Sequence, residues 1–139
     1  SEGGVNFALS QFLLALQRFG ESISYATALT QTNPAFVDGH LALASALGSV
    51  GKYDDAIHAL TTGLSVTEND GNLLIQRGFN YFKLKKYKSA HADFSAANVD
   101  STNEAYILSL IGKCEKEFGD SQAAINTLTK SLQLDVNQA

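Results

Sequence analysis

The 139-residue sequence predicts an all-α protein built from repeated pairs of antiparallel helices, and three observations support this fold class. First, the chain matches itself at an offset of 34 residues over three consecutive segments, 37–70, 71–104 and 105–138. Second, apolar side chains recur at helical spacing on both sides of a turn within each segment. Third, eleven glycines and a single proline suit helices joined by tight turns, because proline breaks helix interiors and glycine ends helices.

Equivalent positions of the three segments, here called columns, hold either small or large side chains. The small columns are Ala44/Gly78/Gly112, Ala56/Ala90/Ala124 and Gly63/Ala97/Ser131, and a large column is Leu60/Phe94/Leu128. Small residues are needed where two helix backbones cross closely, and bulky residues fill the adjacent gaps. Each segment is therefore expected to form one hairpin, whose first helix we call helix A and whose second we call helix B.

The predicted turns divide the chain into four units of one continuous array. Turns are expected at Gly51-Lys52, Lys85-Lys86 and Gly119-Asp120, within units 37–70, 71–104 and 105–139. Upstream, residues 5–19 and 21–32 predict another helix pair with a turn at Gly20. Because that turn is displaced by three residues from the repeat register, we interpret residues 1–36 as a degenerate N-terminal unit.

The columns resemble the tetratricopeptide repeat, a 34-residue helix-turn-helix with the pattern W-x2-L-G-x2-Y followed by A-x3-F. The middle of the three matching units, 71–104, fits this pattern best, through Leu74, Gly78, Tyr81, Ala90, Phe94 and Ala97. Departures from the pattern are the missing tryptophan, the missing closing proline at Glu68, Thr102 and Val136, and the missing tyrosines at Glu115 and Ser121. The resemblance implies a right-handed α-solenoid that binds proteins and catalyses no reaction.

Charge and composition favour a soluble protein without nucleic-acid binding. The formal net charge is −4, and the one basic cluster, from Lys83 to Lys88, neutralises too few phosphates for a nucleic-acid interface. The longest apolar uncharged stretch, 39–51, is shorter than the roughly 20 residues that span a bilayer. With a lone cysteine, Cys114, and no signal peptide, we expect a cytoplasmic location and no membrane insertion.

Catalytic and metal-binding patterns are not found in the sequence. His40, His58 and His91 fall in different units, without the close spacing of a zinc site. Cys114 has no neighbouring histidine in the sequence, and a small core residue explains it better than a nucleophile. We therefore expect no enzyme activity, no metal and no cofactor.

The resemblance also implies where a partner would bind, because helix A lines a concave groove in this family. The helix A residues that remain after removal of the core columns are Asp38, Leu41, Ser45, Ser49, Asn72, Ile75, Phe79, Phe82, Lys83, Tyr106, Ser109, Lys113 and Lys116. Among them we predict these partner-binding residues: Leu41, Ser45, Asn72, Ile75, Phe79, Phe82, Tyr106, Lys113 and Lys116.

Two interpretations of the aromatic residues in the middle unit stay open. Phe79 and Phe82 either form an exposed interaction surface or pack on a neighbouring helix or second subunit. Leu41, Ser45 and Phe79 stand where a clamp for acidic heat-shock-protein tails would carry lysine, asparagine or another polar residue, so that specialised clamp is absent. A hydrophobic ligand with an acidic group near Lys113 and Lys116 fits better.

The predicted function is a non-catalytic adaptor that binds a protein or peptide segment through the helix A groove. The alternative is a structural module of a larger array or homo-oligomer, since Leu128, Leu132 and Leu134 are expected on an open C-terminal surface. One internal correlation supports the hairpin: Arg77 and Asp93 are charged only in the middle unit, and we predict a salt bridge between them.

Overall fold

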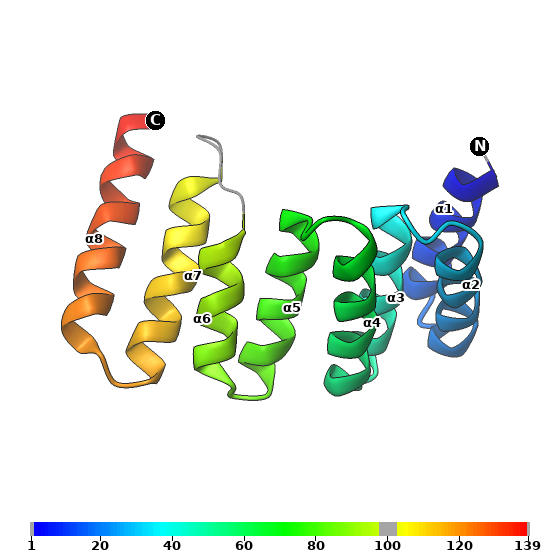
Figure 1. Ribbon diagram of the computed structural model, residues 1–139, viewed down its shortest axis with the longest axis horizontal. Coiled ribbons are helices and arrows are strands. Elements are labelled where there is room, and N and C mark those ends of the chain that lie inside the picture. The colour runs from blue at the N-terminus through cyan, green and yellow to red at the C-terminus, as the bar shows by residue number, and fades with distance from the viewer. Residues whose placement is uncertain (1, 98–102, 139) are drawn as a thin grey trace.

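The computed structural model describes residues 2–97 and 103–138, and over these residues the chain forms eight α-helices (Figure 1). They are α1 (Glu2–Ala15), α2 (Phe19–Thr32), α3 (Val37–Ser49), α4 (Tyr53–Val66), α5 (Gly71–Lys83), α6 (Tyr87–Ala96), α7 (Glu104–Glu117) and α8 (Ser121–Gln138). Consecutive helices pair into four hairpins that stack side by side, with α1 and α8 at opposite ends (Figure 1). This arrangement confirms the all-α fold class. Thr102, one of the three positions without the closing proline, lies outside the described residues.

The turn inside each hairpin contains one residue with left-handed backbone geometry. These residues are Gln17, Gly51, Lys85 and Gly119, with φ of 60°, 78°, 61° and 90°. They are spaced by 34 residues, so the N-terminal hairpin keeps the register of the other three. The predicted turn at Gly20 was wrong, because Gly20 lies in the first turn of α2. Glycine adopts this conformation more often than glutamine does, so the sequence did not indicate a turn at Gln17.

The same hydrogen bond closes all four turns. In each, the amide after the left-handed residue donates to the carbonyl five residues earlier, at 2.9 Å: Arg18 to Leu13, Lys52 to Leu47, Lys86 to Tyr81, and Asp120 to Glu115. This bond satisfies a carbonyl that the end of a helix would otherwise leave unpaired. The repeat therefore extends to the backbone geometry of the turns.

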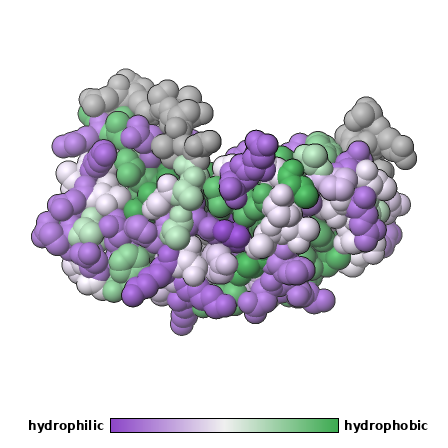
Figure 2. Space-filling model, viewed as in Figure 1, coloured by the Kyte–Doolittle hydropathy of each residue, from purple (hydrophilic) through white to green (hydrophobic). Residues whose placement is uncertain are grey.

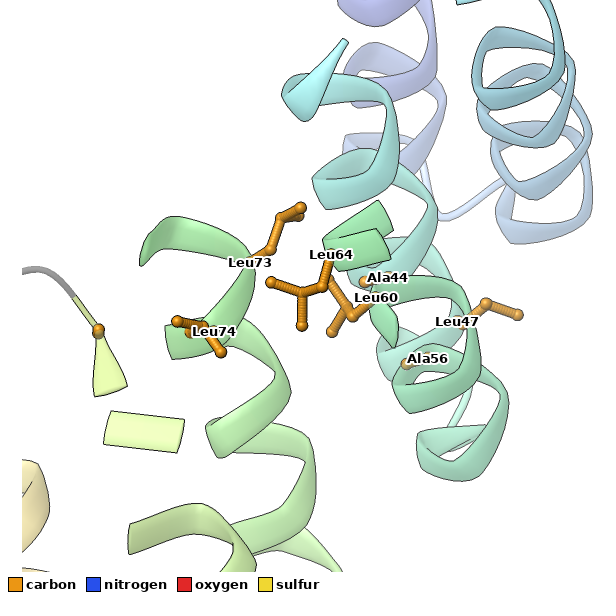
Figure 3. Close-up of a cluster of buried hydrophobic side chains, with 8 residues drawn as sticks. Ala44, Leu47, Ala56, Leu60, Leu64, Leu73 and Leu74 are labelled. Carbon is orange, nitrogen blue, oxygen red and sulfur yellow. The ribbon is translucent and has the colours of Figure 1, made fainter. Parts of the chain in front are cut away.

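Large side chains of helix B pack on small residues of helix A, as the columns predict. A Cβ added to Gly78 would lie 2.6 Å from Cε1 of Phe94, and one added to Gly112 would lie 2.7 Å from Cγ of Leu128. Neither position has room for a side chain. Between the second and third hairpins, Leu60 and Leu64 of α4 share a buried cluster with Leu73 and Leu74 of α5 and with Ala44 and Leu47 of α3 (Figure 3).

The C-terminal surface differs from the prediction. Leu132 is exposed, at 66%, but Leu128 and Leu134 are half-buried. Leu128 lies against Gly112 inside its own hairpin, so its predicted place on the open surface was wrong. In the repeat register, Leu128 is equivalent to Leu60 and Phe94, which are buried. Like Phe94, it packs on the glycine of its own helix A.

Candidate functional site

The three helices α3, α5 and α7 border two adjoining hollows, which together we call the helix A groove. The first, of about 430 Å³, lies between α3 and α5. Its lining is mixed: Ala44, Ser45, Gly48, Ser49, Tyr53, Gln76, Phe79, Asn80 and Lys83. The lining therefore combines the hydroxyl and amide side chains of Ser45, Gln76 and Asn80 with the aromatic residues Tyr53 and Phe79.

The second hollow, of about 270 Å³, lies between α5 and α7 and is more apolar. It is lined by Phe79, Phe82, Lys83, Phe94, Leu110 and Lys113. Phe79 and Lys83 line both hollows, so the two hollows adjoin at the end of α5. Figure 2 shows hydrophobic side chains reaching the surface between hydrophilic ones over the middle helices.

Phe79 and Phe82 pack on helix B of their own unit and also line the groove. The Phe79 ring meets Phe94 edge-on at 5.5 Å between centroids, and Phe82 meets Tyr87 at 5.0 Å. Both phenylalanines are half-buried. Edge-to-face packing fixes their orientation, because the positive ring edge is attracted to the negative face. Both rings therefore pack on a neighbouring helix, which was one of the two interpretations of these residues. Both also line the second hollow of the groove.

The other predicted partner-binding residues divide into three groups. Ser45 and Lys113 line the hollows. Leu41 and Ile75 are half-buried and pack against the core cluster of α3, α4 and α5, so their side chains contribute to folding. Asn72, Tyr106 and Lys116 are exposed but line neither hollow.

Sequence reasoning missed several lining residues, including Gln76 and Asn80. Asn80 is 8% exposed, and its amide donates to the Gln76 carbonyl at 2.8 Å. A signal existed for Asn80, since its column holds the apolar residues Ala46 and Cys114. A buried amide in an otherwise apolar column needs hydrogen-bond partners and is therefore a candidate for function.

The predicted ion pair in the middle unit is confirmed. Arg77 donates from Nε to Oδ2 of Asp93 at 2.8 Å and from Nη2 to Oδ1 at 2.7 Å. The hydrogen bonds to Asp93 raise the pKa of the Arg77 guanidinium. The Asp93 side chain is only 6% exposed, and the pair supplies the partner that a buried carboxylate requires.

The buried titratable side chains of Cys114 and His40 lie apart from the helix A groove. Cys114 is fully buried, and burial, with Glu115 and Glu117 nearby, raises the pKa of its thiol to about 11. His40 is buried, with Nε2 2.6 Å from the Pro34 carbonyl oxygen. Within residues 2–97 and 103–138, no three His, Cys, Asp or Glu side chains gather as metal ligands, and no helix is long and apolar enough to cross a membrane.

A separate apolar cavity of about 380 Å³ lies among α2, α3 and α4. His40, His58 and Asp55 contribute to its wall beside Ile23, Leu43, Leu47 and Val66. His40 is held by its contact with the Pro34 carbonyl and lies against Gly63, where a Cβ would come within 2.7 Å of the ring. This packing makes His40 a core residue of the second hairpin.

Comparison with known proteins identifies the fold of the chain. No protein-family model matches the sequence. RNA polymerase II-associated protein 3 of Xenopus tropicalis is 33% identical over 87 residues, which make up 63% of this chain but only 13% of that protein. The chain therefore corresponds to a small part of that relative.

Solved structures superpose on nearly the whole chain, among them the following three. MamA does so with a TM-score of 0.85 at 13% identity, over 98% of this chain and 80% of that one. PilF of Pseudomonas aeruginosa gives 0.82 at 18%, over 97% and 62%. A thermophilic TPR protein of Thermus thermophilus gives 0.76 at 18%, over 97% and 78%. At these identities the likeness concerns the fold.

Proposed function

Because the chain has the tetratricopeptide-repeat fold, we propose that it is a non-catalytic scaffold that binds a peptide segment of another protein in the helix A groove. Proteins of this fold generally mediate protein–protein interaction. The observation that carries the proposal is the pair of adjoining hollows that share Phe79 and Lys83. Two adjoining hollows, one apolar and one mixed, suit an extended or helical segment better than a small compact ligand.

The lining of the groove favours a ligand of particular chemistry. Phe79, Phe82 and Leu110 offer an apolar wall for a buried anchor side chain. Lys83 and Lys113 stand in the same hollow and place two ammonium groups beside that anchor. We therefore expect the ligand to combine an apolar residue with a carboxylate, and to meet Ser45, Gln76 and Asn80 with backbone polar groups in the first hollow.

Selection from a displayed peptide library tests this proposal. We expect selected peptides to carry an apolar residue next to Asp or Glu. Their Kd, measured by fluorescence anisotropy, should rise about tenfold in a Lys83→Glu, Lys113→Glu variant, because two attractive charges become repulsive. Both lysines are exposed, so the variant should keep its fold.

The matched control is Lys88→Glu on α6, an exposed lysine that lines neither hollow. It makes the same change of charge at one position and should leave the Kd within about twofold. Equal affinity of all variants for every selected peptide would contradict binding in the helix A groove.

A further inference from the structure

The apolar cavity among α2, α3 and α4 lies where the middle unit, 71–104, carries larger side chains. Its lining includes Leu43, Leu47 and Ala59. The equivalent residues, 34 positions later in the sequence, are Arg77, Tyr81 and Asp93. Because protein interiors are close-packed, smaller side chains at such positions leave space between the helices.

In the middle unit these larger side chains contact one another. Arg77 donates to Asp93 of α6 and, at 3.2 Å, to Thr61 of α4. Its guanidinium lies 5.8 Å from the centre of the Tyr81 ring. Thr61 is the equivalent of Thr27, which lines the cavity. Four equivalent positions therefore hold a group of contacting side chains in one unit and border a cavity of about 380 Å³ in the other.

The threonines in the lining present little polar surface to the cavity, because each hydroxyl donates within its own helix. Thr27 donates to the Ile23 carbonyl at 2.7 Å, and Thr30 donates to the Thr27 carbonyl at 2.8 Å. Thr62 donates to the His58 carbonyl at 3.1 Å. A water molecule is held in a cavity by two to four polar partners. The inside of this cavity therefore favours an apolar occupant.

The mouth of the cavity is polar. Gln31, Asp55 and His58 contribute to the lining and are exposed. Among the lining residues that the structure describes, Val66 is the one exposed large apolar side chain. A stable protein interface buries about 800 Å² on each partner and has an apolar core. This rim offers no such core, so the cavity suits a small molecule better than a protein surface.

We propose that the cavity binds a small, uncharged aromatic molecule of one or two fused rings. The Tyr81 ring at the equivalent place in the middle unit supports a flat ring as the occupant. A volume of about 380 Å³ suits a molecule of this size, and burial of its apolar surface favours binding. A charged ligand would lose its hydration among apolar side chains. None of the described lining residues belongs to the helix A groove, so this proposal is independent of peptide binding there.

A two-dimensional NMR titration of the full chain with indole tests the proposal. We expect saturable shifts of the Thr27, Leu47 and Ala59 amides, with a Kd on the order of 0.1–1 mM. The amides of Phe79 and Leu110 in the helix A groove should shift little. Shifts without saturation, or shifts confined to the helix A groove, would overturn the proposal.

Variants that fill the cavity with the side chains of the middle unit locate the binding. Leu47→Tyr should raise the Kd for indole at least about tenfold, because its ring takes the ligand's place. The double variant Leu43→Arg, Ala59→Asp should do the same by a different filling, and it decides the question if Leu47→Tyr loses helicity by circular dichroism. Ala28→Tyr is the matched control, since Ala28 is exposed on α2 outside the lining, and its Kd should stay within about twofold. Unchanged affinity in the folded filled variants would overturn the proposal.

A second ligand separates a free molecule from an aromatic side chain of a protein. N-acetyltryptophanamide carries the same ring system attached to peptide groups. We expect it to bind no more tightly than indole, because the cavity encloses the ring alone. Clearly tighter binding of N-acetyltryptophanamide would identify a protein side chain as the occupant and would overturn the proposal of a small molecule.

Discussion

Asp93 of α6 accepts two hydrogen bonds from Arg77 of α5, at positions where the preceding unit holds Ala59 and Leu43. The Arg77 guanidinium also donates to Thr61 of α4 at 3.2 Å and lies 5.8 Å from the centre of the Tyr81 ring. The ion pair therefore joins the two helices of one hairpin and reaches the hairpin before it.

Replacing Asp93 alone with Ala should lower the free energy of unfolding by about 3 kcal/mol, because Arg77 loses its partner in a mostly buried place. The double variant Arg77→Leu, Asp93→Ala copies the residues of the preceding unit and should lie within about 1 kcal/mol of the wild type. Urea unfolding of the single and double variants measures both values. A double variant as unstable as the Asp93 variant would show that the ion pair stabilises the fold by more than the neutralisation of one charge by the other.

Glu115 is a second buried carboxylate, but among the described residues nothing hydrogen-bonds to its Oε1. Its column holds Leu13, Leu47 and Tyr81. Glu115→Leu should therefore raise the free energy of unfolding by about 1–3 kcal/mol, since it removes an unsatisfied polar group. Glu117→Leu, at an exposed position on the same helix, should change it by less than about 0.5 kcal/mol. A loss of stability in the Glu115 variant would mean that the carboxylate has a stabilising partner.

The hairpin turns offer a test of backbone strain. Lys85 has φ of 61° where two equivalent positions hold Gly51 and Gly119. Lys85→Gly should stabilise the chain by about 0.5–1 kcal/mol, because glycine adopts this conformation without a Cβ clash. Gly119→Ala, at φ of 90°, should destabilise it by about 1 kcal/mol or more. Thermal unfolding followed by circular dichroism compares the two, and shifts of the same sign would refute the strain argument.

The buried thiol of Cys114 should resist modification. Its pKa is raised to about 11 from an ordinary 9.0. Between these two pH values the thiol stays neutral in the folded chain but ionises in the unfolded chain. Stability is therefore retained below pH 9 and declines as the pH rises from 9 to 11. At pH 8, a disulfide reagent such as DTNB should react about a hundredfold more slowly with the folded chain than with the chain in urea. Equal rates would mean that the thiol is accessible.

The fold was predictable because the repeat itself encodes it. Small columns such as Ala44/Gly78/Gly112 required close helix crossings, and Phe94 on Gly78 shows that packing. The turn in the N-terminal hairpin was not predictable, because Gln17 is an ordinary residue in an unusual conformation.

The candidate site was predictable only in part. Helical spacing located helix A, and the family resemblance pointed to its residues Ser45, Phe79, Phe82 and Lys113, which line the hollows. It did not separate Leu41 and Ile75, which pack on the core, from residues in the hollows. That distinction depends on how neighbouring hairpins are rotated against each other, and a single helix does not encode this rotation.

Binding in the helix A groove is tested most directly by a two-dimensional NMR titration of the full chain with a selected peptide. We predict that the largest amide shifts fall on groove residues of α3, α5 and α7, among them Gly48, Phe79 and Leu110. Shifts confined to α2, α4, α6 and α8 would contradict the account.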